Sequence, residues 1–177
     1  MSWNKRAKQD LVGQPEAVYS AALSYLSRRD YAVAELGNRL LERGADPDVV
    51  AAVLERLRSQ KYLDDQRFAL GRVRQRRTYN GRSRIFIRQE LRELGVDDVT
   101  VQLALDEEYT ETQEAELLEQ LVRAELRRFP KHGTREQKRK FMQSVQRRLA
   151  AKGFSPGEAY RLLCQFSTEL EEDVPCD

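Results

Sequence analysis

The 177-residue chain is poor in the residues that most enzymes and metal proteins use for chemistry. It has one histidine, His132, and two cysteines, Cys164 and Cys176, with no CxxC pair. A GxxxxGK[ST] phosphate loop and an HExxH zinc motif are both missing. We therefore expect no enzyme activity, no metal and no cofactor. We interpret His132 as a plain loop residue and Cys164 as a buried thiol in an apolar stripe.

Long apolar runs are missing as well. No stretch approaches the roughly 20 apolar residues that a membrane-spanning helix needs, and the N-terminus, MSWNKRAKQD, lacks the apolar segment of a signal peptide. The scarcity of cysteine argues against a disulfide framework. We expect a cytoplasmic protein that does not contact membranes, with a flexible N-terminal tail at residues 1–14 and an acidic C-terminal tail at residues 171–177.

Charge is abundant but unevenly distributed. The formal net charge is only +2, yet Arg67–Arg92 contains nine arginines against one carboxylate, Glu90. Asp106–Glu119 has seven acidic residues and no basic one, and Arg123–Lys152 has eleven basic residues against two carboxylates. Basic segments of this density indicate a polyanionic partner, although solvated helix faces also carry many charges.

Three stretches of the chain repeat one pattern. They are LLERGADPDVVAAVL (40–54), LRELGVDDVTVQLAL (91–105) and LAAKGFSPGEAYRLL (149–163). In each, a leucine stands four residues before a glycine, an apolar residue follows the glycine, and an aspartate or serine comes next. Glycine can take the left-handed conformation that ends a helix, and Asp or Ser can cap the helix that follows. The pattern predicts a helix, a tight stop and a second helix, three times over.

Hydrophobic residues recur at helical spacing on both sides of each stop, and a further helical segment precedes each pair, at about residues 16–29, 65–78 and 112–129. No segment alternates as a strand would. The sequence therefore predicts an all-α protein of three tandem three-helix repeats, at residues 15–63, 64–109 and 110–170. A unit of this size buries little surface alone, so the repeats should stack into an elongated, curved array.

Several polar residues have more than one interpretation. Asp64 and Asp65 could be the paired carboxylates of a metal-dependent nuclease, but more simply Asp64 caps a helix and Asp65 favours its first turn. Thr134 with Gln137 has the spacing of a capping box. Tyr79, between arginines, could stack on a nucleic-acid base or pack within its loop.

The arginines and lysines are the candidate functional residues. Many stand one helical turn apart, beside an apolar stripe, and so form basic helix faces. We favour contact with a phosphate backbone, without base specificity, over a solvated face that pairs with the acidic segment; arginine would also suit the carboxylates of an acidic protein surface. The candidate DNA- or filament-binding residues are Arg28, Arg29, Arg72, Arg76, Arg77, Arg82, Arg84, Arg88, Arg92, Arg135, Lys138, Arg139, Lys140, Arg147 and Arg148.

Four stretches carry a family resemblance. The most specific is YLDDQRFA; the others are ALSYLSRRDYAVAELGNRLLERG, NGRSRIFIRQELRELGV and KRKFMQSVQRRLAAKGFSPGEAYRLL. Together, over about residues 16–169, they resemble the RecX family, bacterial regulators of the RecA recombinase. Two departures stand out: Ala32 replaces a helix-capping serine, which leaves Asp30 as the candidate cap, and Ser83 replaces a glycine.

The resemblance implies an all-helical, crescent-like protein that lies in the deep groove of the RecA filament on single-stranded DNA. There it is expected to inhibit strand exchange, ATP hydrolysis and filament growth, as part of the control of DNA repair. It also implies weak, sequence-independent binding to single- and double-stranded DNA. We expect the protein to be a monomer.

The alternative is a sequence-independent DNA-binding protein that acts without a recombinase. A helix, a glycine turn and a second helix are close to a helix-turn-helix motif. However, the helices after the glycines, VVAAVLERL, VTVQLALDEEY and EAYRLLCQF, are apolar or acidic, whereas a recognition helix should present Arg, Asn or Gln to base edges. The composition of these helices therefore favours backbone contact through the basic faces.

Overall fold

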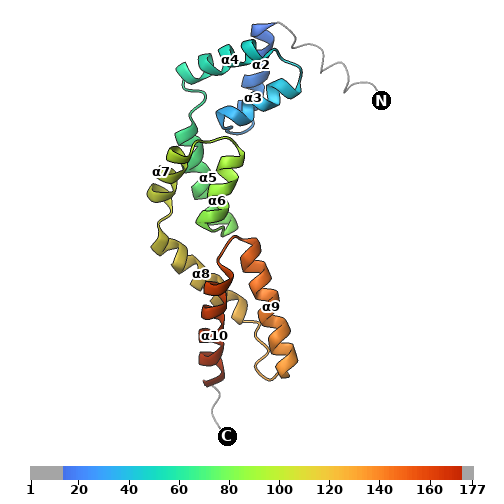
Figure 1. The fold of residues 1–177 in the computed structure, drawn as a ribbon, viewed down its shortest axis with the longest axis vertical. Helices are drawn as coiled ribbons and strands as arrows, with labels where there is room; N and C mark the ends of the chain where they lie inside the picture. Colours follow the sequence, from blue (N-terminus) through green and yellow to red (C-terminus); the bar gives the residue numbers. More distant parts are fainter. Residues whose placement is uncertain (1–13, 173–177) are drawn as a thin grey trace, which may run out of the picture. The chain divides into compact units, whose positions relative to one another are not determined.

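The computed structural model describes the backbone of residues 14–172 and the side chains of residues 14–168. Most of the two predicted tails, and Cys176, lie outside the described residues. Within this range every regular element is a helix (Figure 1), which confirms the predicted all-α helical repeat fold. The helices are α2 (Pro15–Leu26), α3 (Val33–Glu42), α4 (Pro47–Ser59), α5 (Asp65–Asn80), α6 (Arg84–Glu93), α7 (Asp98–Glu108), α8 (Glu111–Leu126), α9 (Arg135–Ala151) and α10 (Pro156–Glu172).

The chain forms two compact units. Unit 1 contains the residues up to Arg72 together with Glu90–Ala104, and unit 2 contains Val73–Gln89 together with the residues from Leu105 onward. Helices α5, α6 and α7 each contribute residues to both units. The boundaries of the three predicted repeats and the predicted curvature stay predictions, and each unit is described by itself below.

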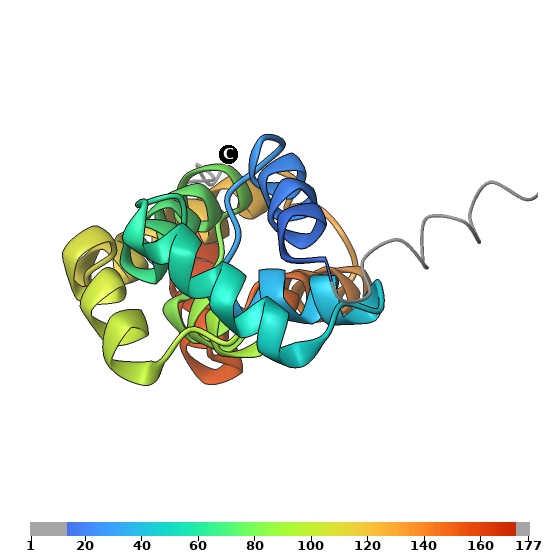
Figure 2. The same ribbon diagram turned by 90° about the horizontal axis from the view of Figure 1, so that it is seen from above.

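In unit 1, helices α2, α3 and α4 lie against one another (Figure 2). Their inner side chains form one hydrophobic core. Val18 and Ala22 of α2 meet Leu36 and Leu40 of α3, and Leu57 of α4 closes the cluster; all five side chains are fully buried. The pairs on α2 and on α3 are each four residues apart, because such positions share one side of a helix. The core thus follows the apolar stripes of the sequence.

In unit 2, helices α8, α9 and α10 pack around a second core. Leu118 and Val122 of α8 meet Val145 and Leu149 of α9, and Leu163 of α10 completes the cluster. All are at most 1% exposed, so a polar substitution at any of them would be costly. The described side chains of unit 2 therefore enclose a core of their own.

The three predicted glycine turns are present and share one hydrogen-bond pattern. Gly44, Gly95 and Gly153 have φ angles of 84°, 82° and 93°, in the left-handed region. At the first turn the Ala45 amide donates to the carbonyl of Leu40 at 3.2 Å, and the same bond recurs from Val96 to Leu91 and from Phe154 to Leu149. This is the Schellman motif, and the spacing of leucine, glycine and apolar residue that recurs in the three stretches is the pattern that it requires.

Several helix starts are capped as the sequence predicts. Asp46 accepts a hydrogen bond from the Asp48 amide at 2.9 Å, and Asp64 accepts one from the Arg67 amide at 3.0 Å. Thr134 and Gln137 form a reciprocal capping box at the start of α9. A second capping box, Thr110 with Gln113, starts α8 and was not predicted, although it has the same spacing.

The start of α3 differs from the prediction. Asp30 is not its cap: the N-cap position is occupied by Ala32, which has no side chain that could accept a hydrogen bond. The amide of Val33 instead donates to Oδ1 of Asp65, at 2.8 Å, from the first turn of α5. Asp65 therefore supplies a cap that the local sequence lacks.

The start of α6 receives the same kind of bond. The amide of Arg84 donates to Oε1 of Glu114, at 2.7 Å, from the first turn of α8. In both cases the carboxylate belongs to a helix that comes later in the chain, and in both it contacts the first helical amide. Such charged acceptors at a helix start also interact favourably with the helix dipole. α6 also has a local cap, because Oγ of Ser83 accepts a hydrogen bond from the Phe86 amide at 3.1 Å. Of these two helices, only α3 thus begins without a side-chain cap from its own segment.

Two of the glycine turns press against these same helix starts. A Cβ atom built on Gly95 would lie 2.4 Å from the Cβ of Ala34, at the start of α3. A Cβ atom built on Gly153 would lie 2.3 Å from Oγ of Ser83, at the start of α6. The Ser83 amide also donates to the carbonyl of Lys152, at 3.0 Å. Glycine is therefore required at these turns for its conformation and for the space it leaves.

Replacing Gly95 with alanine should destabilise the protein strongly. The side chain would be held in the left-handed conformation, at a cost of about 1–2 kcal/mol, and would overlap Ala34, at a cost of about 1–3 kcal/mol. We expect urea unfolding to show a loss of about 2–4 kcal/mol. Gly71→Ala is the matched control, because a Cβ at Gly71 would meet no atom within 4 Å and Gly71 lies inside α5. That substitution should raise stability by up to about 1 kcal/mol. Equal stability of the two variants would contradict this account of the turn.

Candidate nucleic-acid interface

Arg84 is one of the predicted binding residues, but the structure buries it. The residue is 5% exposed, and its guanidinium lies at the end of α7. Nη1 donates to the carbonyl of Leu105 at 3.0 Å and to the carbonyl of Tyr109, and Nη2 pairs with Asp106 at 2.7 Å. The Leu105 carbonyl also accepts a hydrogen bond from the Tyr109 amide, at 2.9 Å, whereas the Tyr109 carbonyl lies just beyond the helix and is reached by Arg84. Arg84 therefore helps to satisfy the C-terminal end of α7. Its contacts serve the fold and leave almost no surface for a partner.

Tyr109 lies beside two of the predicted arginines, Arg84 and Arg77. Its ring is completely buried, the guanidinium of Arg77 lies 5.9 Å from the ring centroid, and its hydroxyl has no hydrogen-bond partner among the described residues. Burial is the main cause that raises the pKa of Tyr109 above its usual value, with a further contribution from the charge of Glu114. The phenol is therefore neutral at physiological pH and acts as part of the core.

Replacing Arg84 with methionine should destabilise the protein while leaving its surface charge pattern otherwise intact. The change leaves the carbonyl of Tyr109 without its Arg84 donor, at a cost of about 1–3 kcal/mol before relaxation, and it also removes the hydrogen bond to Leu105 and the pair with Asp106. We expect a loss of about 2–3 kcal/mol in urea unfolding. Arg92→Met is the control, because Arg92 and its partner Asp98 are 54% and 68% exposed and such pairs contribute about 0–1 kcal/mol. Similar losses in the two variants would show that Arg84 does not have this structural role.

The other predicted arginines of α5, of α6 and of the connector between them are also engaged within the protein. Arg72 pairs with Glu90 at 3.7 Å, and Arg77 donates to Oε1 of Gln113 at 3.0 Å. The remaining contacts are those of Arg76 with Asn80, Arg82 with the carbonyl of Ala151 and the ring of Phe86, and Arg92 with Asp98. Arg88 is half-buried and also has an interaction partner. The dense basic segment of the sequence is therefore mostly a set of internal contacts.

Arg74, which is not among the predicted binding residues, also makes an internal contact. It pairs with Glu108, and the hydrogen bond from its guanidinium lowers the pKa of that carboxyl below its usual value. The pair joins α5 to the last turn of α7 within unit 2. It shows where part of the acidic segment 106–119 is used, as the solvated-face interpretation anticipated.

The third basic segment has a different character. At the junction of α8 and α9, the exposed side chains of Arg127, Arg128 and Lys131 have no ion-pair partner among the described residues. Arg135, Arg139 and Arg147, which are exposed on α9, have none either. We call these six residues the α9 basic surface. Exposed cations that are not held in ion pairs are what a phosphate backbone can bind, because each phosphate contact releases counterions.

Spacing along α9 orders part of this surface. Arg135, Arg139 and Arg147 lie four and then eight residues apart, with the exposed Gln143 between them, so they follow one another along one side of the helix. Lys140 on a neighbouring side is paired with Glu136 at 2.7 Å. Lys138 is half-buried, 5.7 Å from the ring of Phe129. Of the predicted residues on α9, three therefore keep their charge fully available.

Three members of the α9 basic surface were absent from the prediction. Arg127, Arg128 and Lys131 lie between the end of α8 and the start of α9, where no helical stripe draws attention to them. The sequence feature that could have identified them is the local charge, because no carboxylate occurs between Glu125 and Glu136. The structure places all three on the surface, at the end of α8 and in the connector that follows it.

Arg148, the last of the predicted residues on α9, connects α9 to α8. Its guanidinium makes two hydrogen bonds to the carboxylate of Glu125, at 3.0 and 2.7 Å, and one to Ser144. The hydrogen bond from Arg148 is the main cause that lowers the pKa of Glu125. With side chains 47% and 26% exposed, the pair contributes modestly, about 0.5–1 kcal/mol.

The Glu125 pair predicts a specific pH dependence. Because the pKa of Glu125 is lower in the folded than in the unfolded chain, the pair stabilises the protein above the unfolded pKa of about 4.3. This contribution is lost as the pH falls through the folded pKa. Arg148→Gln should therefore cost about 0.5–1 kcal/mol at pH 7, and this cost should shrink as the pH falls below about 4.3, measured by urea unfolding across that range. A stability difference that is independent of pH would contradict the assignment.

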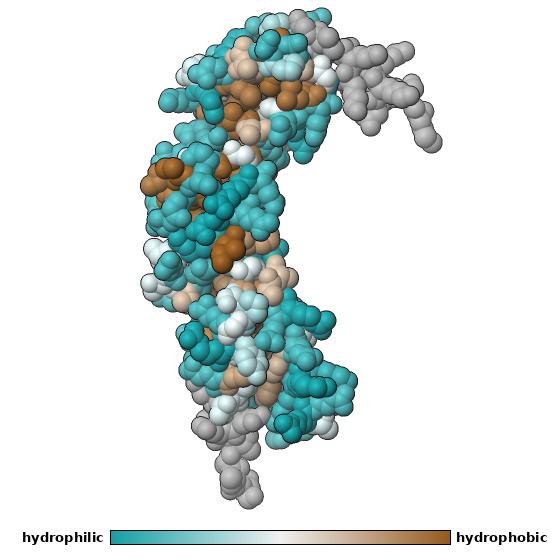
Figure 3. All heavy atoms as spheres, in the orientation of Figure 1, coloured by the Kyte–Doolittle hydropathy of each residue, from teal (hydrophilic) through white to brown (hydrophobic). Residues whose placement is uncertain are grey.

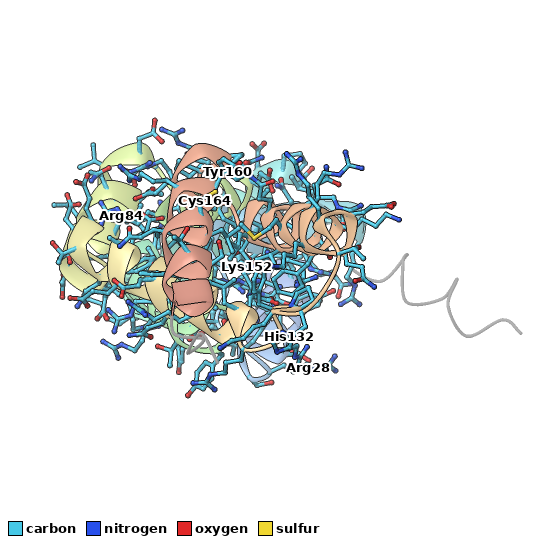
Figure 4. All side chains as sticks on the ribbon, turned by 90° about the horizontal axis from the view of Figure 1, so that it is seen from below. Arg28, Arg84, His132, Lys152, Tyr160 and Cys164 are labelled. Carbon is cyan, nitrogen blue, oxygen red and sulfur yellow. The ribbon has the colours of Figure 1, made fainter. Side chains whose placement is uncertain are left out.

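The two predicted arginines of the first repeat differ from each other. Arg29 pairs with Glu35 at 2.5 Å, and its guanidinium lies 3.6 Å from the centroid of the Tyr31 ring. The hydrogen bond to Glu35 raises the pKa of Arg29. Arg28 is exposed and has no ion-pair partner among the described residues (Figure 4). Only Arg28 of this pair keeps a charge that is available to a partner.

The alternative residues of the sequence analysis also have defined places. Asp64 and Asp65 each cap a helix, so both carboxylates are engaged as acceptors of backbone amides. Tyr79 is 83% exposed near the end of α5, His132 is exposed in the connector before α9, and Cys164 is half-buried in α10 (Figure 4). Among the described helices, none has the length and apolar character to cross a membrane.

Comparison with known protein families gives matches in the first two predicted repeats. The sequence profile of the first three-helix domain of RecX matches residues 19–57, and the profile of its second three-helix domain matches residues 64–105. The regulatory protein RecX of Mycolicibacterium smegmatis is 36% identical over 165 residues, which cover 93% of this chain and 86% of that protein. The regulatory protein RecX of Bacillus subtilis is 33% identical over 156 residues, which cover 88% of this chain. The match spans 57% of the length of the Bacillus protein.

Two solved structures with a similar fold are described as RecX proteins. A crystal structure of regulatory protein RecX superposes with a TM-score of 0.66 and 28% sequence identity, over 85% of this chain and 71% of that one. RecX from Lactobacillus salivarius superposes with a TM-score of 0.70 over 87% of this chain and 97% of that one. At 22% identity the second similarity concerns the fold alone.

Proposed function

This chain belongs to the RecX family of regulatory proteins, and from that premise we propose that it regulates a RecA-type recombinase. In this proposal the protein binds in the groove of the filament that the recombinase forms on single-stranded DNA. Bound there, it slows strand exchange, ATP hydrolysis and filament growth.

The α9 basic surface is the observation that carries this proposal. Its six cations are exposed and have no ion-pair partner among the described residues, so a partner does not have to break internal contacts to reach them. Contacts of this kind to a phosphate backbone position a protein on nucleic acid without reading its sequence. That property suits a regulator which must act on filaments formed on any sequence.

Regulation then follows from contact with more than one component of the filament. In this proposal, ATP turnover in a filament requires its subunits to change their arrangement relative to one another. A protein that holds the enclosed strand and the neighbouring subunits at once favours one arrangement over the others. The expected result is slower turnover and slower growth, with no chemistry performed by the bound chain.

The direct test measures the DNA-dependent ATPase rate of a RecA recombinase as this protein is added. We expect inhibition at well below one protein per recombinase subunit. The variant Arg135→Gln/Arg139→Gln should need about tenfold more protein for the same inhibition, because it loses two phosphate contacts. Arg39→Gln/Lys61→Asn is the matched control: both residues are exposed without an ion pair, and it removes the same charge elsewhere. The control should inhibit as the natural chain does.

Two other outcomes have distinct meanings. Inhibition that is equally strong in the Arg135/Arg139 variant would keep the regulatory function but move the binding surface elsewhere. No inhibition at saturating protein, together with binding of bare single- and double-stranded DNA, would instead support the alternative of a sequence-independent DNA-binding protein. The α9 basic surface alone is compatible with that alternative, so the ATPase measurement decides between the two.

A further inference from the structure

The outer side of α7 carries two large apolar side chains that nothing in the described protein covers. Val99 is 70% exposed and Leu103 is 57% exposed. They lie four residues apart, and therefore one above the other on the same side of the helix. In Figure 3, brown atoms reach the surface over α7 within a teal, polar surrounding. Both residues belong to unit 1.

Packing within the protein does not account for these two residues. The side of α7 that packs within the protein carries Val101 and Ala104, which are each 1% exposed. Polar side chains at the two outer positions would leave these contacts unchanged. Valine is also a weaker helix former than the polar residues that usually occupy an exposed position. An isolated exposed aliphatic residue is ordinary, but two in succession on one helix side form a continuous apolar surface.

The charge around this pair shows what kind of partner it fits. The exposed Asp97 and Asp98 precede Val99, and α7 contains no basic residue. Arg92, which lies nearby, is paired with Asp98 at 2.5 Å. Acidic side chains repel the phosphates of nucleic acid, so DNA is a poor partner for this side of the helix. A protein surface with an apolar pocket and lysine or arginine at its rim is complementary in both respects.

We infer that Val99 and Leu103 form a protein-docking surface, and that they insert into an apolar, basic-rimmed pocket on a recombinase subunit. This inference rests on the proposed function, which supplies the protein partner. An amphipathic helix bound in an apolar groove is commonly anchored by side chains four residues apart. Exposed apolar residues that become fully buried at the centre of a contact contribute most of its affinity.

The inference separates two kinds of contact on one chain. The α9 basic surface belongs to unit 2 and suits phosphates, whereas the Val99/Leu103 surface belongs to unit 1 and suits a protein. A nucleoprotein filament offers both kinds of partner. The two surfaces should therefore respond differently to substitution, and each can be altered without disturbing the other.

The test compares the affinity for recombinase filaments on single-stranded DNA with the affinity for the same DNA alone, using fluorescently labelled protein at one salt concentration. Val99→Ser/Leu103→Ser should weaken filament binding by about tenfold or more, which is typical when anchor side chains are truncated. Binding to bare DNA and the thermal midpoint should stay unchanged, because both residues are exposed. Ile85→Ser is the matched control, since Ile85 is an exposed aliphatic residue of unit 2 at 62% exposure. It should bind filaments as the natural chain does.

Each remaining outcome counts against a specific statement. Filament binding by Val99→Ser/Leu103→Ser that equals that of the natural chain would overturn the docking surface while leaving the proposed function intact. Natural protein that binds filaments no better than bare DNA would overturn both. A conservative variant, Leu103→Met, should keep most of the affinity, because it preserves the apolar volume. Loss of binding in Leu103→Met alone would indicate a role other than apolar insertion.

Discussion

The close contact between a helix-ending glycine and the start of an earlier helix is the constraint on which this structure depends. Gly95 lies against Ala34 within unit 1, and Gly153 lies against Ser83 within unit 2. The same helix starts receive a carboxylate, Asp65 or Glu114, from a later helix. Each turn therefore ends one helix and leaves room for another to begin against it. This double role explains the requirement for glycine at Gly95 and Gly153, two of the three turns.

The constraint also explains why a chain so rich in arginine has few free charges in its second repeat. Where helix ends meet, carbonyl and amide groups leave water and need partners, because a buried polar group without one is costly. Arg84 meets that need at the end of α7, and Arg82 reaches the carbonyl of Ala151. The start of α9 is different: within the described chain it closes with its own capping box, and Arg135 beside it remains available. The proposed function depends on this difference, because it assigns phosphate contact to the exposed Arg135 and structural contacts to Arg82 and Arg84.

Local features of the fold could be predicted from the sequence, and long-range ones could not. The helices and glycine turns follow from apolar spacing and backbone conformation, which neighbouring residues determine. The cap of α3 could not be predicted, because Asp65 lies 32 residues along the chain from the Val33 amide whose hydrogen bond it accepts. Arg84 looked like a member of an exposed stripe, since its spacing is the same whether it faces solvent or a carbonyl. The exposure of Val99 and Leu103 was hidden for a related reason: apolar residues on every side of a short helix do not reveal which side is packed.

Amide hydrogen exchange of the chain, free and bound to recombinase filaments on single-stranded DNA, would test the central claim most directly. The claim is that the arginines of α5 and the start of α6 maintain the fold, while the α9 basic surface and the outer side of α7 contact the filament. We predict new protection in the connector before α9, along α9 and at residues 98–104, with little change in α5. Protection concentrated in residues 72–92, with α7 and α9 unchanged, would contradict the account.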